Sequence, residues 1–294
     1  MQRCIAKNLA VTTITAYEVF FRSVETFLKN EDKLNNIETL IPADIRRYFI
    51  FASNTMIGIT QAGYYRRLNT FFRFLVNDGI LRDNPMLHVE KPKVAKRIIK
   101  TFNINEVNKM MGAYNLDTFI GRRNYTILAL LLATGLRRSE YIKLSMLDVD
   151  LNNAFIRGIG KGDKERLLPI SKGLMVILKK YLASRKEFMK DKIDSPAFFV
   201  TRYGSWMTKE CSNSIFRNLK IDLKLEGKRI SAHTWRHTFA KAFLLNGGDV
   251  FTLQELLGHA DIETTKIYVN LTDSEKKQQN KKYNPLDNMN WQYY

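Results

Sequence analysis

The chain has 294 residues, 45% of them hydrophobic, which is enough for two domains that each bury a core. Lys and Arg total 47 against 29 Asp and Glu, and the net charge of +18 favours a polyanionic partner, usually nucleic acid. Cys4 and Cys211 lie too far apart to suggest a disulfide framework, and no apolar run reaches the roughly 18 residues of a membrane span.

Residues 1–89 predict a small all-α domain. Three apolar runs at helical spacing follow one another, each preceded by a residue suited to a helix start: Thr12 or Thr13, Pro42, and Thr60. Arg66 and Arg67 on the third helix are candidate contacts of DNA phosphates, although an arginine on a helix is more often a solvated surface residue.

Residues 90–100 predict a basic linker. The segment holds five cations, one anion and a proline that resists helix formation. A plain tether needs no such charge, whereas a strap across a DNA backbone does. Lys91, Lys93 and Lys96 are therefore candidate DNA contacts.

The remaining chain predicts a second domain of mixed structure. Expected helices cover 105–114, 119–134, 172–190 and 208–225, and expected strands cover 154–159, 166–170 and 197–200. Gly135 ends the most apolar helix, so Arg137 falls at a helix-to-helix junction. The first two strands form a hairpin with Lys161 at its tip.

The stretch from His233 to Tyr268 contains several side chains that can bind or attack a phosphate. Helical spacing puts His233 and Arg236 on one face. Gly258 suits a helix C-terminus, and Asp261 is the expected N-cap of a short helix that carries Tyr268. An arginine with imidazoles suits a phosphate in its transition state, and the phenol can attack it.

The same stretch also admits a metal interpretation. His233 and His237 are four residues apart, a spacing that serves two zinc ligands on one helix face. Arg236 lies between them, however, and no adjacent glutamate is present to act as a base. A fixed cation beside a metal ion is unfavourable, so we expect no metal site.

The motifs together resemble those of the tyrosine recombinase family, which includes phage integrases and Xer proteins. The matching segments are Ala133-Thr-Gly-Leu-Arg137-Arg-Ser-Glu140, Gly160-Lys161-Gly-Asp-Lys-Glu-Arg166, His233-Thr-Trp-Arg236-His237, Leu257-Gly258-His259 and Tyr268. The resemblance implies that six residues are catalytic: Arg137, Lys161, His233, Arg236, His259 and the nucleophile Tyr268. It also implies that Glu140 supports Arg137, and we expect His237 to lie behind the catalytic groups.

The resemblance further implies a mainly α fold with a small β-sheet, arranged as a two-domain DNA clamp. A SAM-like core-binding domain (1–89) would be joined by the basic linker (90–100) to an α+β catalytic domain (101–270). The tail (271–294) is expected to pack in trans. The implied activity is site-specific recombination through a 3′-phosphotyrosyl intermediate, without metal, ATP or another cofactor.

The implied partners are double-stranded DNA with inverted-repeat core sites and three further copies of the chain, which make a homotetramer on two sites. Whether an accessory protein or a heterologous recombinase takes part stays open. No membrane partner is expected, and the location would be the cytoplasm of a bacterium or phage-infected cell, at the nucleoid. Two alternatives remain: a type IB topoisomerase-like nicking-closing enzyme, and a DNA-binding regulator without strand exchange.

Overall fold

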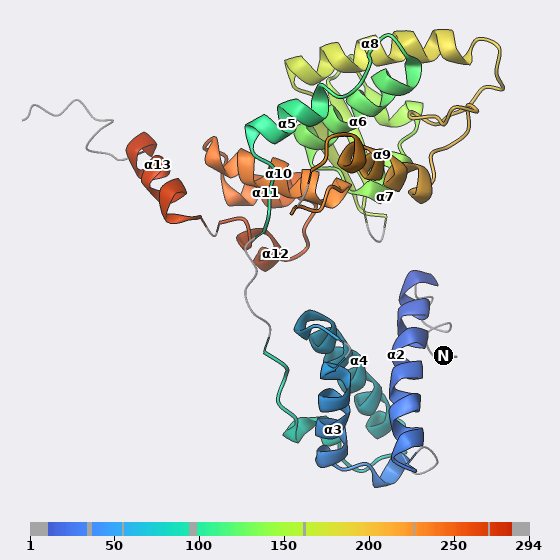
Figure 1. Cartoon of the computed structure of the whole chain (residues 1–294), viewed down its shortest axis with the longest axis vertical. Coiled ribbons are helices and arrows are strands. Elements are labelled where there is room, and N and C mark those ends of the chain that lie inside the picture. The colour runs from blue at the N-terminus through green and yellow to red at the C-terminus, as the bar shows by residue number, and fades with distance from the viewer. Residues whose placement is uncertain are drawn as a thin grey trace, which may run out of the picture. The chain divides into compact units, whose positions relative to one another are not determined.

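The computed structural model describes residues 11–33, 37–54, 56–93, 99–160, 163–225, 227–269 and 271–283. The chain divides into two compact units, Met1–Arg97 and Ile98–Tyr294, each with its own core (Figure 1). The structure is mainly helical with one small sheet, as the sequence predicts. Within the described ranges no helix is both long and apolar enough to span a membrane.

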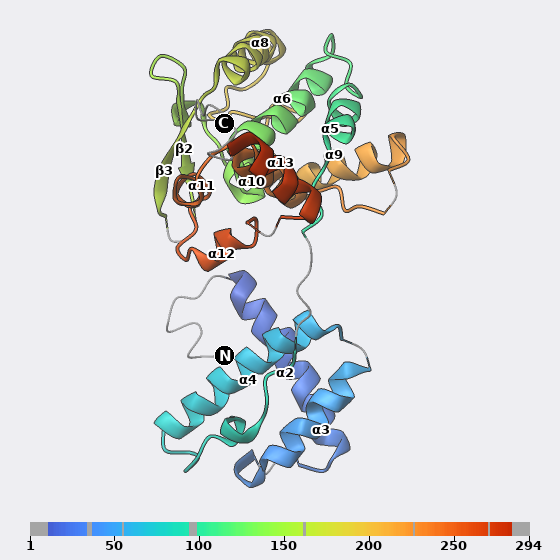
Figure 2. The same ribbon diagram turned by 90° about the vertical axis from the view of Figure 1, so that its left-hand side faces the viewer.

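Unit 1 is a small helical domain. Its elements are α2 (Val11–Asn30), η1 (Ile37–Thr39), α3 (Pro42–Ser53), α4 (Gly58–Asn77) and η2 (Pro85–His88). The three predicted helices are present (Figure 2). Thr12 and Thr13, however, lie inside α2 instead of preceding it, and α4 begins before Thr60. Aromatic side chains dominate the core, where Phe20 meets Tyr64 edge-on at 5.1 Å between ring centroids.

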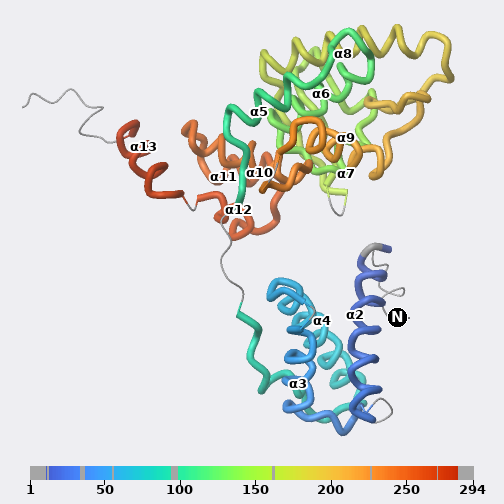
Figure 3. The backbone as a smooth tube through the Cα atoms, viewed as in Figure 1, coloured from blue at the N-terminus to red at the C-terminus, as the bar shows by residue number. Residues whose placement is uncertain are grey.

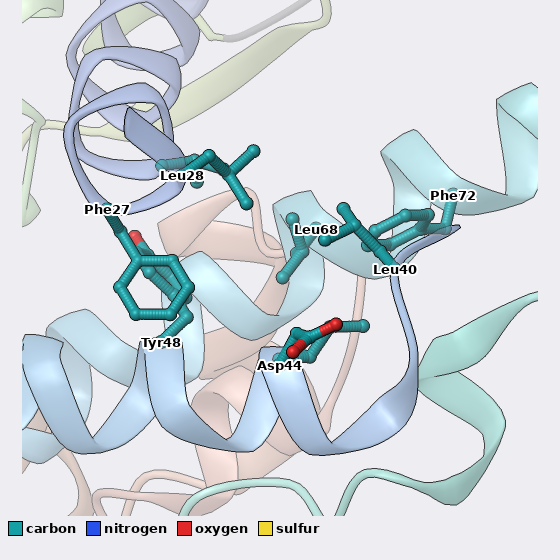
Figure 4. Close-up of a pocket in the computed structure, with 9 residues that line it drawn as sticks. Phe27, Leu28, Leu40, Asp44, Tyr48, Leu68 and Phe72 are labelled. Carbon is teal, nitrogen blue, oxygen red and sulfur yellow. The ribbon is translucent and has the colours of Figure 1, made fainter. Parts of the chain in front are cut away.

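A buried carboxylate fixes the start of α3 in unit 1. Asp44, 2% exposed, borders a cavity of about 20 Å³ among apolar side chains of all three helices (Figure 4). It accepts hydrogen bonds from Lys33 Nζ (2.7 Å), Arg47 and the Ile41 backbone N–H (3.1 Å). Burial works to raise the pKa of Asp44, but these bonds hold it below its ordinary value. The carboxylate therefore stays charged and ties α3 to the end of α2.

Unit 2 is built around a helical core with a hairpin at its edge. Its helices are α5 (Ile104–Met111), α6 (Phe119–Thr134), α7 (Arg138–Ile142), η3 (Met146–Asp148), α8 (Lys172–Met189), α9 (Lys209–Asp222), α10 (Ala232–Leu245), α11 (Val250–Leu257), α12 (Glu263–Lys266) and α13 (Asp273–Tyr283). Its strands are β1 (Val149–Asp150), β2 (Phe155–Ile159) and β3 (Glu165–Pro169), antiparallel in that order.

Helix α6 is the centre of unit 2. The Thr118 hydroxyl accepts a hydrogen bond from the Gly121 N–H at its start, and Gly135 ends it in the left-handed conformation with φ of 62°. Between them Ile127, Leu128 and Leu130 are fully buried, and α6 packs against α8 and α10. The second half of α6, from Ile127 to Ala133, is apolar on every face, and such a helix segment must be buried in this way.

The hairpin is confirmed, and one predicted strand is wrong. Strands β2 and β3 pair with Ile156 opposite Leu168, close to the expected bounds. Residues 197–200, predicted as a strand, make only single bridges, Ser145 to Ala197 and Val200 to Trp206. The run is buried, and side chains of α6 and α8 bind its carbonyls: Arg123 donates to Val200 O, Tyr181 to Phe198 O and Arg185 to Ala197 O.

Helix α13 contacts the C-terminal end of α10 in the same chain. Glu275 pairs with Lys241 at 2.6 Å, and Gln279 Nε2 donates to the Leu245 carbonyl at 2.7 Å. The ring of Tyr283 covers Gly247, whose φ is 98°. These contacts hold the described part of the tail to its own unit.

Candidate active site

The site is organised around the C-terminal end of α11. The last backbone carbonyls of this helix and its cap each accept a hydrogen bond from a different arginine. The three bonds run from Arg166 Nε to Leu256 O (2.8 Å), from Arg236 Nη2 to Leu257 O (2.7 Å) and from Arg137 Nη2 to Gly258 O (2.9 Å). A helix C-terminus carries partial negative charge, so it is suited to gathering cations. Figure 3 traces the chain from α10 through α11 to α12.

The carboxylate of Glu140 binds two of these three arginines, Arg137 and Arg166. Glu140, 5% exposed, receives both Nη atoms of Arg166 at 2.7 and 2.8 Å, and Nη1 of Arg137 at 3.0 Å. It also accepts the Arg137 backbone N–H at 2.6 Å, which begins α7. Burial raises the pKa of Glu140, but these hydrogen bonds outweigh it and the net pKa is lowered. The ionised Glu140 thus fixes the Arg137 guanidinium.

Arg236 is the most deeply placed of the three guanidiniums. It is 3% exposed, and its Nη1 donates to the carbonyl of Gly135 at 2.6 Å, at the C-terminal end of α6. Burial, and then the neighbouring charge of Arg137, lower its pKa to about 10. It remains a cation at neutral pH. Arg236 therefore bridges the ends of two helices, α6 and α11.

The imidazole of His259 is neutral and its tautomer follows from its partners. Its Nε2 faces Arg236 Nη2 at 3.0 Å and its Nδ1 faces Thr265 Oγ1 at 2.8 Å. Burial, followed by the surrounding arginines, lowers the pKa of His259 to about 4. Because a guanidinium can only donate, Nε2 accepts and the proton sits on Nδ1. In this form His259 Nε2 would need a second proton before it could donate to a phosphate.

Tyr268 lies just beyond α12 and packs against α10 and α11. It is 4% exposed and packs with Phe239 and Leu257, and the His259 ring stacks on it at 6.5 Å between centroids. Its Oη is 2.7 Å from His237 Nδ1. Burial raises the pKa of the Tyr268 phenol, which Arg236 and Arg137 partly oppose. The phenol is therefore protonated at neutral pH.

The other two predicted catalytic residues are His233 and Lys161. His233 is exposed, 4.1 Å from the His237 ring between centroids, and makes no hydrogen bond within the described ranges. Lys161 lies outside the described residues, but its neighbour Gly160 borders the arginine group: a Cβ there would be 3.6 Å from both Arg137 Nη1 and Glu140 Oε1.

Of the predicted DNA contacts in unit 1 and the linker, Arg66, Lys91 and Lys93 are exposed. Arg67 is half-buried, with its guanidinium 5.7 Å from the centre of the Tyr64 ring. Lys96 is not among the described residues.

Arg166 is the site residue that the sequence analysis missed. On β3 it shares the face of Leu168, and Ile170 just beyond the strand continues that face; both are buried. A charged residue on the buried face of a strand requires a buried partner, which here is Glu140. This periodicity was the available signal.

For the metal interpretation of His233 and His237, the described residues contain no group of three His, Cys, Asp or Glu side chains suited to a metal ion.

Comparisons with known proteins place this site in a family. Residues 100–275 match the phage integrase family, and the chain belongs to it. The tyrosine recombinase XerD of Listeria innocua is 35% identical over 283 residues, 96% of this chain and 95% of that protein. XerD of Shewanella oneidensis is 28% identical over 283 residues, 95% of this chain and 93% of that protein. The chain is therefore a tyrosine site-specific recombinase, an enzyme that cuts and rejoins DNA, and the nicking-closing and regulator alternatives are not favoured.

Solved structures show the same fold. XerH bound to palindromic difH substrate, in a post-cleavage complex, superposes with a TM-score of 0.76 at 18% identity, over 94% of this chain and 81% of that chain. A lambda integrase dimer bound to a COC′ core site gives a TM-score of 0.73 at 14% identity, over 91% of each chain.

The Arg166–Glu140 pair generates a prediction about stability. Arg166→Ala should destabilise unit 2 by about 3–5 kcal/mol, because it leaves a buried carboxylate with one partner fewer. Urea unfolding followed by tryptophan emission measures this, since Trp206, Trp235 and Trp291 all belong to unit 2. Lys164→Ala, which removes an exposed cation of the same hairpin, is the control and should change the midpoint little. Equal midpoints for the two variants would contradict the role given to Arg166.

Proposed function

We propose that Tyr268 is the nucleophile of the recombinase and attacks a DNA phosphate to form a 3′-phosphotyrosyl intermediate. The observation that carries this proposal is the continuity between phenol and arginines: His259 stacks on the Tyr268 ring and contacts Arg236 at 3.0 Å. The bond from Oη to phosphorus forms as the bond to the 5′ oxygen breaks. One phosphoester replaces another, so the step needs no nucleotide cofactor.

Arg137 and Arg236 are proposed to bind the non-bridging oxygens of this phosphate. A guanidinium has five N–H groups. Within the described residues Arg137 uses two of its side-chain donors, and Arg236 makes three hydrogen bonds, so both keep donors for a phosphate. Rigid donors aimed at developing charge stabilise a phosphorane without reorganisation. His233, which is exposed on α10, is the candidate that the family resemblance implies for assisting ionisation of the phenol.

Lys161 is proposed to protonate the departing 5′ oxygen. The position of Gly160 beside Arg137 supports this, because Lys161 is the residue bonded to Gly160. The hydroxyl of a second DNA strand would later attack the phosphotyrosine and complete the exchange.

The nucleophile is tested by Tyr268→Phe. This variant should bind core-site DNA but form no covalent adduct with a nicked suicide substrate on a denaturing gel, because it lacks the attacking oxygen. Tyr283→Phe, which alters a tyrosine of α13, is the matched control and should form the adduct at the normal rate. Adduct formation by the Tyr268 variant would assign the nucleophile to another residue.

The general acid is tested by Lys161→Ala. Removing a general acid should slow cleavage by about 10²–10⁴-fold. A substrate with sulfur in place of the bridging 5′ oxygen should restore the rate, because a thiolate leaves without a proton. Lys164→Ala, the neighbouring hairpin cation, should be normal on both substrates. A variant as slow on the sulfur substrate as on ordinary DNA would remove Lys161 from this role.

Binding and assembly are proposed from the same family membership. Unit 1 would act as the core-binding domain, with Arg66 and Arg67 near phosphates, and residues 90–100 as a strap that uses Lys91, Lys93 and Lys96. Two inverted-repeat sites would hold four copies of the chain, in a bacterial or phage context. Reconstitution with the purified chain and DNA alone tests whether an accessory protein or a second recombinase takes part.

The tail is proposed to link neighbouring copies. Its aromatic end, residues 286–294, lies outside the described residues, and α13 before it is held to its own α10. An apolar groove of about 540 Å³ lies on unit 2 close to this point, lined by residues of α5, α6 and α10 that include Val107, Phe239 and Phe243. Leu286, Met289 and Trp291 suit such a groove on an adjacent copy, head to tail.

A chain that stops after Tyr283 tests this link. It keeps α13 and its contacts, so single-site binding and adduct formation should persist. Cooperative complexes of two sites and complete recombination should be lost, because the anchor between copies is missing. Native gels with one-site and two-site DNA measure both. Full recombination by the shortened chain would disprove the donated tail.

A further inference from the structure

His237 is the group nearest to the attacking oxygen, and the proposed mechanism leaves it unused. Its Nδ1 lies 2.7 Å from Tyr268 Oη, and the two ring centroids are 5.4 Å apart. His233, one helical turn earlier on α10, makes no hydrogen bond to the phenol in the part of the chain that the structure describes. Of these two histidines, therefore, His233 is exposed, whereas His237 is hydrogen-bonded to the phenol.

The direction of the hydrogen bond follows from burial. Tyr268 is 4% exposed and its Oη has no other described partner. If His237 donated, the phenol O–H would be a buried donor without an acceptor, which costs about 1–3 kcal/mol. The phenol therefore donates to Nδ1, and a neutral His237 carries its own proton on Nε2.

Partial burial and the groups around His237 explain why it is a neutral acceptor in the free enzyme. Burial, and then His233, Arg236 and His259, lower its pKa to about 4. His233 and Arg236 lie on its own helix, His259 follows α11, and Tyr268 follows α12. None of these four groups is negative in the free chain. An anion placed among them would favour the protonated imidazole.

We propose that His237 positions the Tyr268 phenol and accepts its proton as the phenol attacks the DNA phosphate. As the bond from Oη to phosphorus forms and the bond from phosphorus to the 5′ oxygen breaks, the phenol proton moves to Nδ1. The 5′ oxygen takes its proton from the proposed acid, Lys161. The bound phosphate is the anion that the cluster lacks, so the phenol stays protonated and unreactive until DNA enters. This inference rests on Tyr268 as the nucleophile.

The decisive experiment compares His237→Asn with His233→Asn. In His237→Asn the introduced amide can still accept the phenol hydrogen bond but cannot take the proton. Single-turnover adduct formation on the suicide substrate is measured against pH, with DNA binding by gel shift. His237→Asn should bind normally and cleave about 10²-fold more slowly at neutral pH. Its rate should rise with pH as hydroxide replaces the imidazole.

Fluorinated tyrosine at position 268 separates proton acceptance from packing. A trifluorotyrosine has a much more acidic phenol and needs less help to ionise. It should restore most of the rate of His237→Asn. It should not rescue His233→Asn, whose imidazole is exposed and makes no described hydrogen bond to the phenol. Normal cleavage by His237→Asn, or a slow rate that fluorination leaves unchanged, would overturn the proposal.

A measurement on the otherwise native chain covers the case in which His237→Asn does not fold. With His237 present, fluorination of Tyr268 should change the cleavage rate only modestly, because the proton is transferred during attack. A rate that grows in proportion to the ionised fraction of the phenol would mean that solvent removes the proton first, which overturns the proposal. The Tyr268→Phe experiment tests the nucleophile independently of His237.

Discussion

The C-terminal end of α11 is the constraint on which the site depends. Three guanidiniums from β3, α10 and the α6–α7 junction converge there, and three like charges at such proximity repel one another. The partial negative charge of the helix end and the ionised Glu140 offset that repulsion. Each arginine donates to a separate carbonyl, and these hydrogen bonds fix the positions of the three guanidiniums relative to one another.

Two glycines make this arrangement sterically feasible. Gly135 and Gly258 end α6 and α11 with φ of 62° and 63°, a conformation that other residues rarely adopt. A Cβ on Gly135 would also lie 2.4 Å from the Phe239 ring. The carbonyls of both glycines accept arginine hydrogen bonds. The two glycines that end the helices thus also orient the carbonyl groups that bind Arg236 and Arg137.

The electrostatic balance of the free site explains its fit to a phosphodiester. Its imidazoles His237 and His259 are neutral because they are half-buried beside fixed cations, and the phenol is protonated because it is buried. A phosphate anion is the charge that would complete the cluster. The site is therefore arranged for a substrate that arrives charged, and it holds the phenol in its less reactive form without one.

The sequence by itself predicts the helices, the hairpin and several of the side chains that the structure brings together. Apolar periodicity predicts α6 and α10, and the order of motifs predicts that Arg137, Arg236, His259 and Tyr268 converge, as they do in the structure. Spacing also places His233 and His237 on one helix face. Spacing alone does not predict which of the two histidines forms a hydrogen bond with the Tyr268 phenol, because that depends on how the segment after α11 folds back.

The tertiary structure alone decided the remaining partnerships. Arg166 and Glu140 are 26 residues apart, and Arg166 and Leu256 are 90 apart, so no local pattern encodes their contacts. The apolar run 197–200 has strand-like composition but is buried by helices, because packing overrides local propensity. Local periodicity determines which face of an element is buried, whereas side-chain pairing is determined only when distant elements meet.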